Sequence, residues 1–175
     1  MSKLYSYTYS SLDGVIASPE KWVSPYFSNE MTEDLGQRLR SCAAMVLGRR
    51  TYTEFSQFWP TQGSEVPFAD LNNNIRKYVV TETLAQAEWR NSSIVKLQDL
   101  EHLKSAGSLH ITGSGILIRS LLERGLIDEI IIMMCPVVLG SGQRHFEGAK
   151  ATGLQLVSAL PFPRGVMCLT YQRER

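Results

Sequence analysis

Short apolar runs alternate with helix-like segments along most of this chain, and this alternation limits the possible folds more than any other feature. Residues 43–47, 77–80 and 109–112 each form a run that is too short for a buried helix and is followed directly by glycine or threonine. Helix-like residues follow at 49–55 and 116–124. Such alternation favours a parallel sheet, because a connection between parallel strands has to cross one face of the sheet. We therefore predict an α/β domain with a mostly parallel central sheet and helices on both faces.

The N-terminal part of the chain is predicted to contain one strand and one helix. Residues 3–9 alternate large apolar side chains with small polar ones, as in a strand whose two faces differ. Met31, Leu35 and Leu39 recur every four residues, and this spacing is typical of an amphipathic helix. Carboxylates at the start of this segment favour the helix dipole, so we place the helix at about residues 29–41.

The C-terminal part shows a less regular pattern. Residues 130–134 and 165–172 are predicted to be strands that run antiparallel to the rest of the sheet, because no helix clearly separates them. Between them, Gly140-Ser141-Gly142 is predicted to form a hairpin turn, since glycine readily adopts the positive φ angles of tight turns. The alternative is that these glycines belong to a binding loop.

Length, composition and charge indicate an ordinary globular protein. The 175 residues are predicted to form one domain, residues 1–175, and 43% of them are hydrophobic. The formal net charge is +1, without a long basic or acidic block, so we expect neither nucleic acid nor a membrane among the partners. No apolar stretch has the length of a signal peptide or a membrane span, which favours a cytoplasmic location.

The cysteines and histidines give no sign of a metal site. Cys42, Cys135 and Cys168 are an odd number of widely spaced residues, with no CxxC motif and no histidine at ligand spacing. This pattern favours a reduced, cytoplasmic protein without structural zinc. His102, His110 and His145 are isolated in the sequence, and we expect ordinary surface or core histidines.

Three predicted strands end in residues that suit a ligand with phosphate groups. In an open α/β sheet, ligands bind beyond the carboxyl ends of the parallel strands. Residues 48–51 offer a glycine, two arginines and a threonine, residues 81–83 offer two threonines, and residues 113–115 offer two glycines before a helix. Because N–H groups at a helix start bind phosphate, we expect a pyrophosphate at the last of these segments.

The usual nucleotide-binding motifs are absent. Where the dinucleotide fingerprint has its third glycine this chain has Ile118, and no GxxxxGK[ST] motif occurs. A glycine loop before a helix can also be a purely structural turn, and adjacent arginines are often simply solvated. If Arg49 or Arg50 instead meets the 2′-phosphate of a nicotinamide dinucleotide, the cofactor is NADPH. A charged hydrogen bond of about 1.5–3 kcal/mol would then favour NADPH over NADH.

Four stretches, spread from the first predicted strand to the last third of the chain, form a recognisable series. They are Ser11-Leu12-Asp13-Gly14-Val15-Ile16-Ala17, Val46-Leu47-Gly48-Arg49-Arg50-Thr51-Tyr52, Gly113-Ser114-Gly115, and Gly125-Leu126-Ile127-Asp128-Glu129 running into Pro136-Val137-Val138-Leu139-Gly140-Ser141-Gly142. This series resembles the dihydrofolate reductase-like superfamily, and within it the reductase domain of the bifunctional riboflavin-biosynthesis deaminase-reductase. The motifs are more specific for the fold than for the substrate.

The resemblance implies that NADPH lies across the carboxyl edge of the sheet. The segment for the adenosine 2′-phosphate would be Gly48, Arg49, Arg50 and Thr51, with Thr81 beside it. The pyrophosphate segment would be Gly113, Ser114, Gly115, Ile116 and Leu117. The loop that touches the nicotinamide would be Val15, Ile16 and Ala17. The resemblance also implies a homodimer.

A reductase of this kind needs a source of protons, because the cofactor supplies only the hydride. Dihydrofolate reductases place a carboxylate on the helix after the first loop, and here that helix carries Glu30, Glu33 and Asp34. We take Glu33 as the candidate, although the helix dipole alone explains all three. Asp13 is the second candidate, because it lies on the loop expected near the nicotinamide, although an Asp-Gly turn by itself explains an aspartate.

The sequence therefore predicts an NADPH-dependent reductase that resembles 5-amino-6-(5-phosphoribosylamino)uracil reductase of riboflavin biosynthesis. Its substrate would be a small pyrimidine- or pteridine-like heterocycle. The zinc signature of the deaminase domain is absent from the chain. Two alternatives remain open at this point, a non-catalytic nucleotide-binding module and a dihydrofolate reductase proper.

Overall fold

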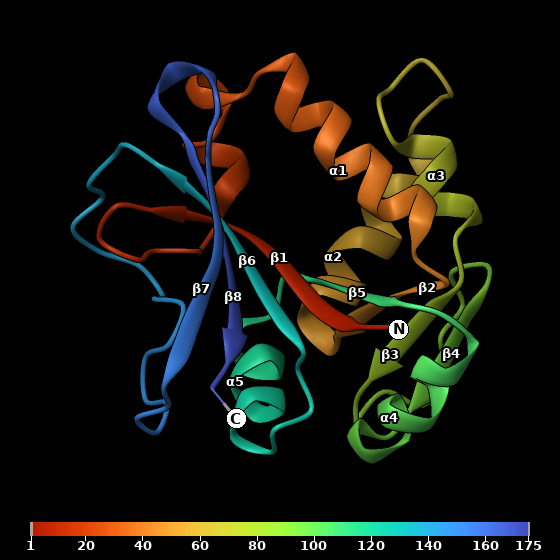
Figure 1. Cartoon of the computed structure of the whole chain (residues 1–175). Coiled ribbons are helices and arrows are strands. Elements are labelled where there is room, and N and C mark those ends of the chain that lie inside the picture. Colours follow the sequence, from red (N-terminus) through yellow and green to blue (C-terminus); the bar gives the residue numbers. More distant parts are fainter. Residues whose placement is uncertain (1, 175) are drawn as a thin grey trace.

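A computed structural model describes residues 2–174 and contains one sheet of eight strands (Figure 1). The strands are β1 (Leu4–Ser11), β2 (Ala44–Gly48), β3 (Lys77–Val80), β4 (Ser92–Val95), β5 (Leu109–Thr112), β6 (Glu129–Cys135), β7 (Leu154–Pro161) and β8 (Met167–Arg173). Their order across the sheet is β4-β3-β2-β5-β1-β6-β8-β7. The strands from β4 to β6 are parallel, whereas β8 and β7 are antiparallel to their neighbours. The predicted fold class is confirmed.

Helices cover both faces of the sheet. They are α1 (Asn29–Ser41), α2 (Arg49–Phe58), α3 (Ala69–Asn74), α4 (Leu100–Leu103) and α5 (Gly115–Glu123). Short 3-10 helices span Pro19–Lys21, Ser24–Tyr26, Trp59–Thr61, Leu97–Asp99, Lys104–Ala106 and Pro163–Gly165. The first three α-helices pack on one face, and α4 and α5 pack on the other (Figure 1). No helix within residues 2–174 is long and apolar enough to cross a membrane.

Helix α1 begins and ends where the sequence pattern predicts. Its inner face buries Met31 and Leu39, and Leu35 lies half-buried between them. Burying a side chain of this size contributes about 1.5–3 kcal/mol. The hydroxyl of Ser28 accepts a hydrogen bond from the N–H of Met31 at 3.3 Å and so caps the first turn. The helix is thereby fixed across β1 and β2 (Figure 1).

Two sequence-based predictions for the C-terminal part are wrong. Strand β6 runs parallel to β1, because α5 carries the chain across the sheet from β5 to the far side of β1. Gly140-Ser141-Gly142 is not a hairpin turn, since it lies in the long connection between β6 and β7, and β8 separates these two strands. Strand β7 was not predicted, because its large apolar side chains are mostly exposed and show no clear alternation.

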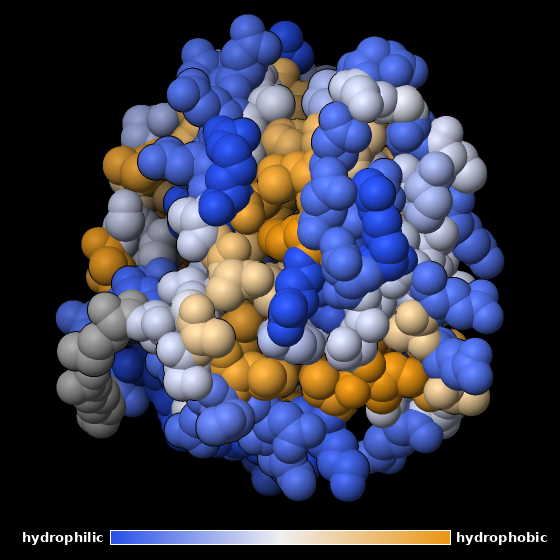
Figure 2. Space-filling view, turned by 90° about the vertical axis from the view of Figure 1, so that its right-hand side faces the viewer, coloured by the Kyte–Doolittle hydropathy of each residue, from blue (hydrophilic) through white to orange (hydrophobic). Residues whose placement is uncertain are grey.

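The topology brings the predicted ligand segments to one edge. Strands β3, β2, β5 and β1 are neighbours in that order and parallel, so their carboxyl ends lie side by side. Seen from the side of β3 and β4, the molecule shows hydrophobic side chains between hydrophilic ones (Figure 2). Strand β4, which carries the exposed Ile94, lies on this side of the molecule (Figure 1). The candidate site is therefore built by the loops that follow the four strands.

Candidate active site

The loops after β2 and β5 approach each other so closely that glycine is required on both sides. A Cβ atom placed on Gly48 would lie 2.9 Å from Cβ of Ser114 and even closer to its Oγ. A Cβ atom placed on Gly113 would lie 2.9 Å from Oγ1 of Thr51. Gly113 also has a φ angle of 65°, which most other residues avoid. These glycines therefore bring two predicted phosphate segments into direct contact.

The start of α5 presents unused backbone donors. Ser114, with a φ angle of 54°, turns the chain sharply into the helix, and its Oγ accepts from the N–H of Leu117 at 3.3 Å. Its carbonyl oxygen accepts from the N–H of Ile118 at 3.1 Å. No hydrogen-bond acceptor among the described residues reaches the N–H groups of Gly115 and Ile116. Two donors at the positive end of a helix suit a phosphate group.

The two arginines predicted to meet the 2′-phosphate differ in their surroundings. Arg50 donates from Nε to Oε1 of Glu54 at 3.0 Å, one turn further along α2. Arg49 is exposed, and the ion pairs among residues 2–174 do not include it. Both stand at the N-terminus of α2, directly after Gly48. Arg49 is thus the arginine without a neighbouring carboxylate, whereas Arg50 pairs with Glu54 through Nε alone.

The remaining cofactor candidates are Thr81 after β3 and two residues at the start of α5, Ile116 and Leu117. Thr81 follows β3, and its Oγ1 accepts from the N–H groups of Thr83 and Leu84 at 3.2 Å each. The side chain of Leu117 is buried in the core under α5 and its N–H is taken by Ser114, so it can offer the ligand little. Ile116 is 64% exposed. It contributes its N–H group, while its side chain lies on the surface.

The predicted nicotinamide loop borders the same place. A Cβ atom on Gly115 would lie 2.8 Å from Cδ1 of Ile16. The loop is held from outside by the connection after β6, because the N–H of Ile16 donates to the carbonyl of Gln143 at 3.0 Å. Val15 is buried and forms an isolated bridge with Arg144. The indole N–H of Trp22 donates to the carbonyl of Ala17 at 2.9 Å and fixes the inner end of the loop.

Asp13 faces the connection after β6. Its carboxylate accepts hydrogen bonds from the Ser11 hydroxyl at 2.7 Å and from the N–H groups of Leu139 and Gly140 at 3.0 and 2.9 Å. Nη2 of Arg144 lies 3.8 Å from Oδ2. The hydrogen bond from Ser11, followed by that from Leu139, lowers the pKa of Asp13 to about 2. An aspartate that stays ionised in this way is suited to tether a loop and is a poor proton donor at neutral pH.

The three carboxylates of α1 point in different directions. Glu33, our sequence-based candidate, is exposed, and so is Glu30 near the start of the helix. Asp34 is half-buried and accepts two hydrogen bonds from Arg38, at 2.8 Å from Nε and 3.0 Å from Nη2. The guanidinium of Arg38 in turn lies 5.7 Å from the centre of the Tyr7 ring. The inward-facing carboxylate of the helix is therefore Asp34.

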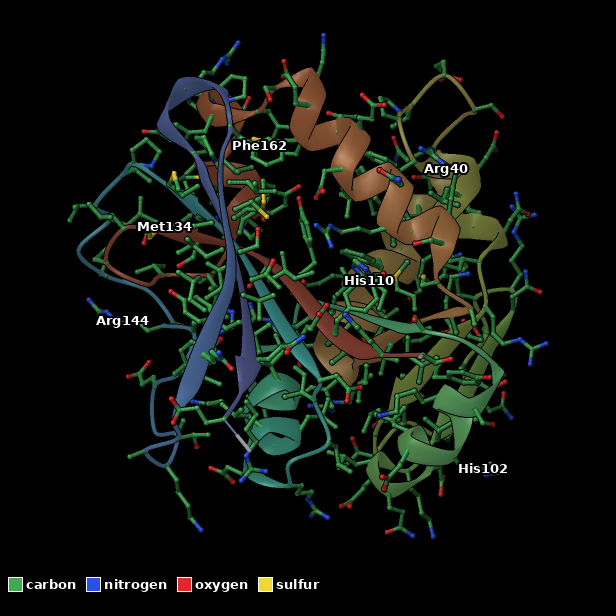
Figure 3. The ribbon with its side chains drawn as sticks, in the orientation of Figure 1. Arg40, His102, His110, Met134, Arg144 and Phe162 are labelled. Carbon is green, nitrogen blue, oxygen red and sulfur yellow. The ribbon has the colours of Figure 1, made fainter. Side chains whose placement is uncertain are left out.

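Beneath α1, the sheet carries a cluster of polar side chains, which we call the tyrosine–histidine cluster: Tyr7, Tyr9, His110 and Thr112. Figure 3 shows His110 between α1 and the strands β1 and β5. The Tyr7 and His110 rings stack with centroids 6.0 Å apart, and Tyr7 meets Tyr9 edge to face at 5.7 Å. Thr112 pairs with Tyr7 across β5 and β1 and directly precedes Gly113. The cluster thus adjoins the candidate phosphate segments.

Sequence reasoning did not identify this cluster. The alternation Tyr5, Tyr7, Tyr9 in β1 does place three tyrosines on one face of the strand, and that was the available signal. The sequence gives no indication that His110 and Thr112 of β5 lie beside them, because this contact depends on β5 pairing with β1 across a large separation in the chain.

A groove of about 1020 Å³ lies elsewhere on the molecule. It runs along α2 and the segment between β3 and β4, over Tyr52 and Trp89. None of the predicted site residues lines it. The candidate active site is accordingly defined by the converging strand ends and not by this groove.

Comparison with known proteins gives a consistent result. A model of the RibD C-terminal domain matches residues 3–168. The uncharacterized protein YyaP of Bacillus subtilis (strain 168) is 28% identical over 153 residues, which are 81% of this chain and 80% of that protein. A putative riboflavin biosynthesis protein from Shewanella sp. PV-4 superposes with a TM-score of 0.78 at 21% identity and 99% coverage of both chains.

Two further structures connect the fold to reductases. The deaminase/5-amino-6-(5-phosphoribosylamino)uracil reductase of Thermotoga maritima superposes with a TM-score of 0.70 at 15% identity, over 99% of this chain and 57% of that one. Dihydrofolate reductase from Enterococcus faecalis, solved with NADP(H), gives a TM-score of 0.64 at 17% identity, over 99% and 97% of the two chains. The dihydrofolate reductase-like fold expected from the sequence is confirmed.

Proposed function

Because the chain belongs to the RibD C-terminal domain family, we propose that it is an NADPH-dependent reductase of the kind found in riboflavin biosynthesis. It would transfer a hydride to a pyrimidine- or pteridine-like heterocycle. When bound, NADPH supplies the hydride and leaves as NADP⁺, and the acceptor heteroatom takes a proton from the protein or from water.

The observation that supports this proposal best is the contact between the loops after β2 and β5. Gly48 lies against the side chain of Ser114, and Gly113 lies against the side chain of Thr51, so the two loops meet directly beside the space where a ligand would lie. The free N–H groups of α5 and the unpaired Arg49 border this space. We assign the pyrophosphate to Gly113, Ser114, Gly115 and Ile116, and the adenosine 2′-phosphate to Arg49 with Thr51 and Thr81 nearby. The nicotinamide would lie toward Ile16 and Ala17.

The substrate would bind at the tyrosine–histidine cluster, next to the nicotinamide end of the cofactor. This placement is supported by Thr112, which belongs to the cluster and is joined directly to the Gly113 loop. Among the carboxylates of α1, the half-buried Asp34 is the one that faces the cluster. We propose that Asp34 holds Arg38 in place through two hydrogen bonds and thereby orders the cluster. Asp13 would keep the nicotinamide loop in place from the outside.

The cofactor assignment is tested by titrating the protein with NADPH and NADH and following the melting temperature. Arg49→Ala should weaken NADPH about tenfold or more and leave NADH nearly unchanged, because a charged hydrogen bond contributes about 1.5–3 kcal/mol. Arg50→Ala is the matched control, since Arg50 already pairs with Glu54, and it should change either affinity far less. Equal loss of both cofactors in Arg49→Ala, or no binding at all, would refute the assignment.

The non-catalytic module remains the second candidate, because Asp13 is held as a loop tether and Glu33 faces solvent. Both proposals expect NADPH binding. Only the reductase consumes NADPH when a heterocyclic substrate is added, which is followed by the loss of its absorbance. A dihydrofolate reductase proper would also bind antifolates tightly, and a melting-temperature screen with methotrexate separates it from the other two.

We also propose that the protein is a homodimer in solution. This proposal is supported by β7, an edge strand on which the side chains of Leu156, Val157 and Leu160 are about half exposed. A strand edge with apolar side chains is a ready surface for pairing with another strand.

A further inference from the structure

We infer that the side chain of Gln143 is a further cofactor contact, whose carboxamide donates a hydrogen bond to the pyrophosphate of NADPH at the end that faces the nicotinamide. This inference rests on the proposed reductase function. It adds a residue of the connection between β6 and β7 to the strand-end loops that hold the cofactor. Gln143 lies one residue beyond the last of the four sequence motifs.

The main chain of Gln143 is fixed against the loop assigned to the nicotinamide. Its carbonyl oxygen accepts a hydrogen bond from the N–H of Ile16 at 3.0 Å. Two residues further along, the N–H of His145 donates to the carbonyl of Gly14 at 2.9 Å. Because these bonds involve only the backbone, the side chain of Gln143 is not needed to hold the connection in place.

The side chain of Gln143 points inward, toward the start of α5. Arg144 forms an isolated antiparallel bridge with Val15, and adjacent side chains of an extended segment point to opposite sides. Arg144 lies on the outer side of the molecule (Figure 3). Nε2 of Gln143 lies 3.6 Å from the position that a Cβ atom on Gly115 would take, and Cδ1 of Ile16 lies 2.8 Å from the same position. The carboxamide therefore lies where the segments assigned to the pyrophosphate and to the nicotinamide meet.

The carboxamide of Gln143 is accessible and has no partner. Gln143 is half-buried, and no described residue forms a hydrogen bond with its Oε1 or Nε2. Neither atom belongs to the buried side-chain atoms that lack a partner, so solvent reaches both of them. In contrast to the buried hydroxyls beneath α1, these atoms can meet a ligand without a change of the fold.

A neutral amide suits this place better than a cation. An N–H group that donates to a charged phosphate oxygen forms a charge-assisted hydrogen bond, which is stronger than a neutral one. The nicotinamide ring becomes positively charged when it gives up its hydride, and a fixed cation beside it would oppose that step. Gln143 supplies the donor to the phosphate without adding a positive charge.

The experiment titrates the protein with NADPH, NADH and adenosine 2′,5′-bisphosphate and follows melting temperature and tryptophan fluorescence. The bisphosphate carries the 2′-phosphate but neither the nicotinamide nor the phosphate on the nicotinamide ribose. We expect Gln143→Ala to weaken NADPH and NADH by the same factor, about tenfold, and to leave the bisphosphate unchanged. Without ligand, this variant should keep the wild-type melting temperature, because the backbone bond to Ile16 remains.

Two further variants separate a cofactor contact from a packing role. Gln143→Glu keeps the shape of the side chain but replaces the donor by a carboxylate, so it should weaken both dinucleotides more than Gln143→Ala does. Gln37→Ala is the matched control, because Gln37 is exposed on α1, and it should change no affinity. Wild-type affinity for the dinucleotides in either Gln143 variant, or an equal loss of the bisphosphate, would overturn the inference.

The inference and the proposed function fail in different ways. NADPH binding by the wild type is measured first, and its absence would refute the reductase function and the inference together. Arg49→Ala should show the opposite pattern to Gln143→Ala, with weaker binding of NADPH and of the bisphosphate but not of NADH. If Arg49→Ala behaves in this way and Gln143→Ala binds both dinucleotides as the wild type does, the cofactor site stands and only the role of Gln143 is refuted.

Discussion

At the scale of single residues, the two carboxylates that the sequence nominated for proton transfer lie in very different surroundings. Asp13 accepts three hydrogen bonds and ties the nicotinamide loop to the segment after β6. Glu33 stands on the exposed face of α1. The sequence could place Asp13 on the loop after β1 and Glu33 on helix α1. It could not show which way either side chain faces, since that depends on contacts with residues far along the chain.

Asp13→Asn should lower activity by loosening the loop. The amide nitrogen would face N–H donors where the carboxylate now accepts, so we expect a lower melting temperature, a higher KM for NADPH and an unchanged shape of the pH profile of kcat. Glu33→Gln, as the exposed control, should change none of these. The measurement is NADPH oxidation between pH 5 and 9. A pH profile that loses a limb in Asp13→Asn would instead assign proton transfer to Asp13.

His145 carries a pH dependence of stability. It is 3% exposed, Nε2 lies 2.6 Å from Oγ1 of Thr8, and burial lowers its pKa to about 4. The unfolded chain has a histidine pKa of about 6.5, so it binds the proton more readily than the folded protein. The contribution of the neutral ring to stability is therefore complete above about pH 6.5 and decreases as the pH falls toward 4, by up to about 1.4 kcal/mol per pH unit.

Urea unfolding at pH 7 and pH 4.5 checks this expectation. His145→Gln should lose less stability between the two pH values than the wild type, because its side chain does not titrate. His102→Gln should behave as the wild type, since His102 is exposed in both states. Equal pH dependence in all three proteins would show that His145 does not carry the effect.

At the scale of elements, the junction of β2 and α2 with the start of α5 decides whether the cofactor space exists. Gly48→Ala would place a methyl group against the side chain of Ser114, and such overpacking costs about 1–3 kcal/mol. We expect a lower melting temperature and at least tenfold weaker NADPH binding. The double variant Gly48→Ala/Ser114→Gly removes the atoms that collide and should recover most of the stability, because glycine replaces a serine cap at a cost of a few tenths of a kcal/mol. Additive losses in the double variant would contradict the close approach.

The elements differ in how well the sequence predicts them. α1 follows from the spacing of its buried side chains, and β3 and β5 follow from short, continuously buried runs that end at turn residues. The direction of β6 cannot be predicted from a local pattern, because it depends on how α5 connects β5 to the far side of β1. Strand β7 has too few buried side chains to leave a pattern. The tyrosine–histidine cluster shows the same limit, since β1 provides half of it and β5 provides the other half.

At the scale of the whole molecule, the two edges of the sheet differ. Strand β4 closes one edge with a short strand on which Ile94 is 38% exposed. Strand β7 closes the other with eight residues, of which Leu156, Val157 and Leu160 are 50%, 51% and 53% exposed. A long, apolar edge strand that carries no charge is rarely left uncovered, because it invites pairing with further strands. This asymmetry is why we assign the dimer contact to β7.

Replacing Leu156 and Leu160 together by lysine should convert the homodimer into a monomer. Two copies of β7 that pair antiparallel about a twofold axis bring the same residues of both protomers together, so the added charges would repel one another and resist burial. Light scattering after gel filtration, at several protein concentrations, measures the mass. Ile94→Lys on β4 is the matched control and should leave the mass of a dimer unchanged. A wild type that stays monomeric at tens of micromolar would refute the homodimer. A doubly substituted protein that stays dimeric would show that the dimer contact does not involve β7.

The monomeric variant should still bind NADPH with the affinity of the wild type. The reason is that the cofactor and substrate segments lie at the ends of β2, β3, β5 and β1, away from this edge.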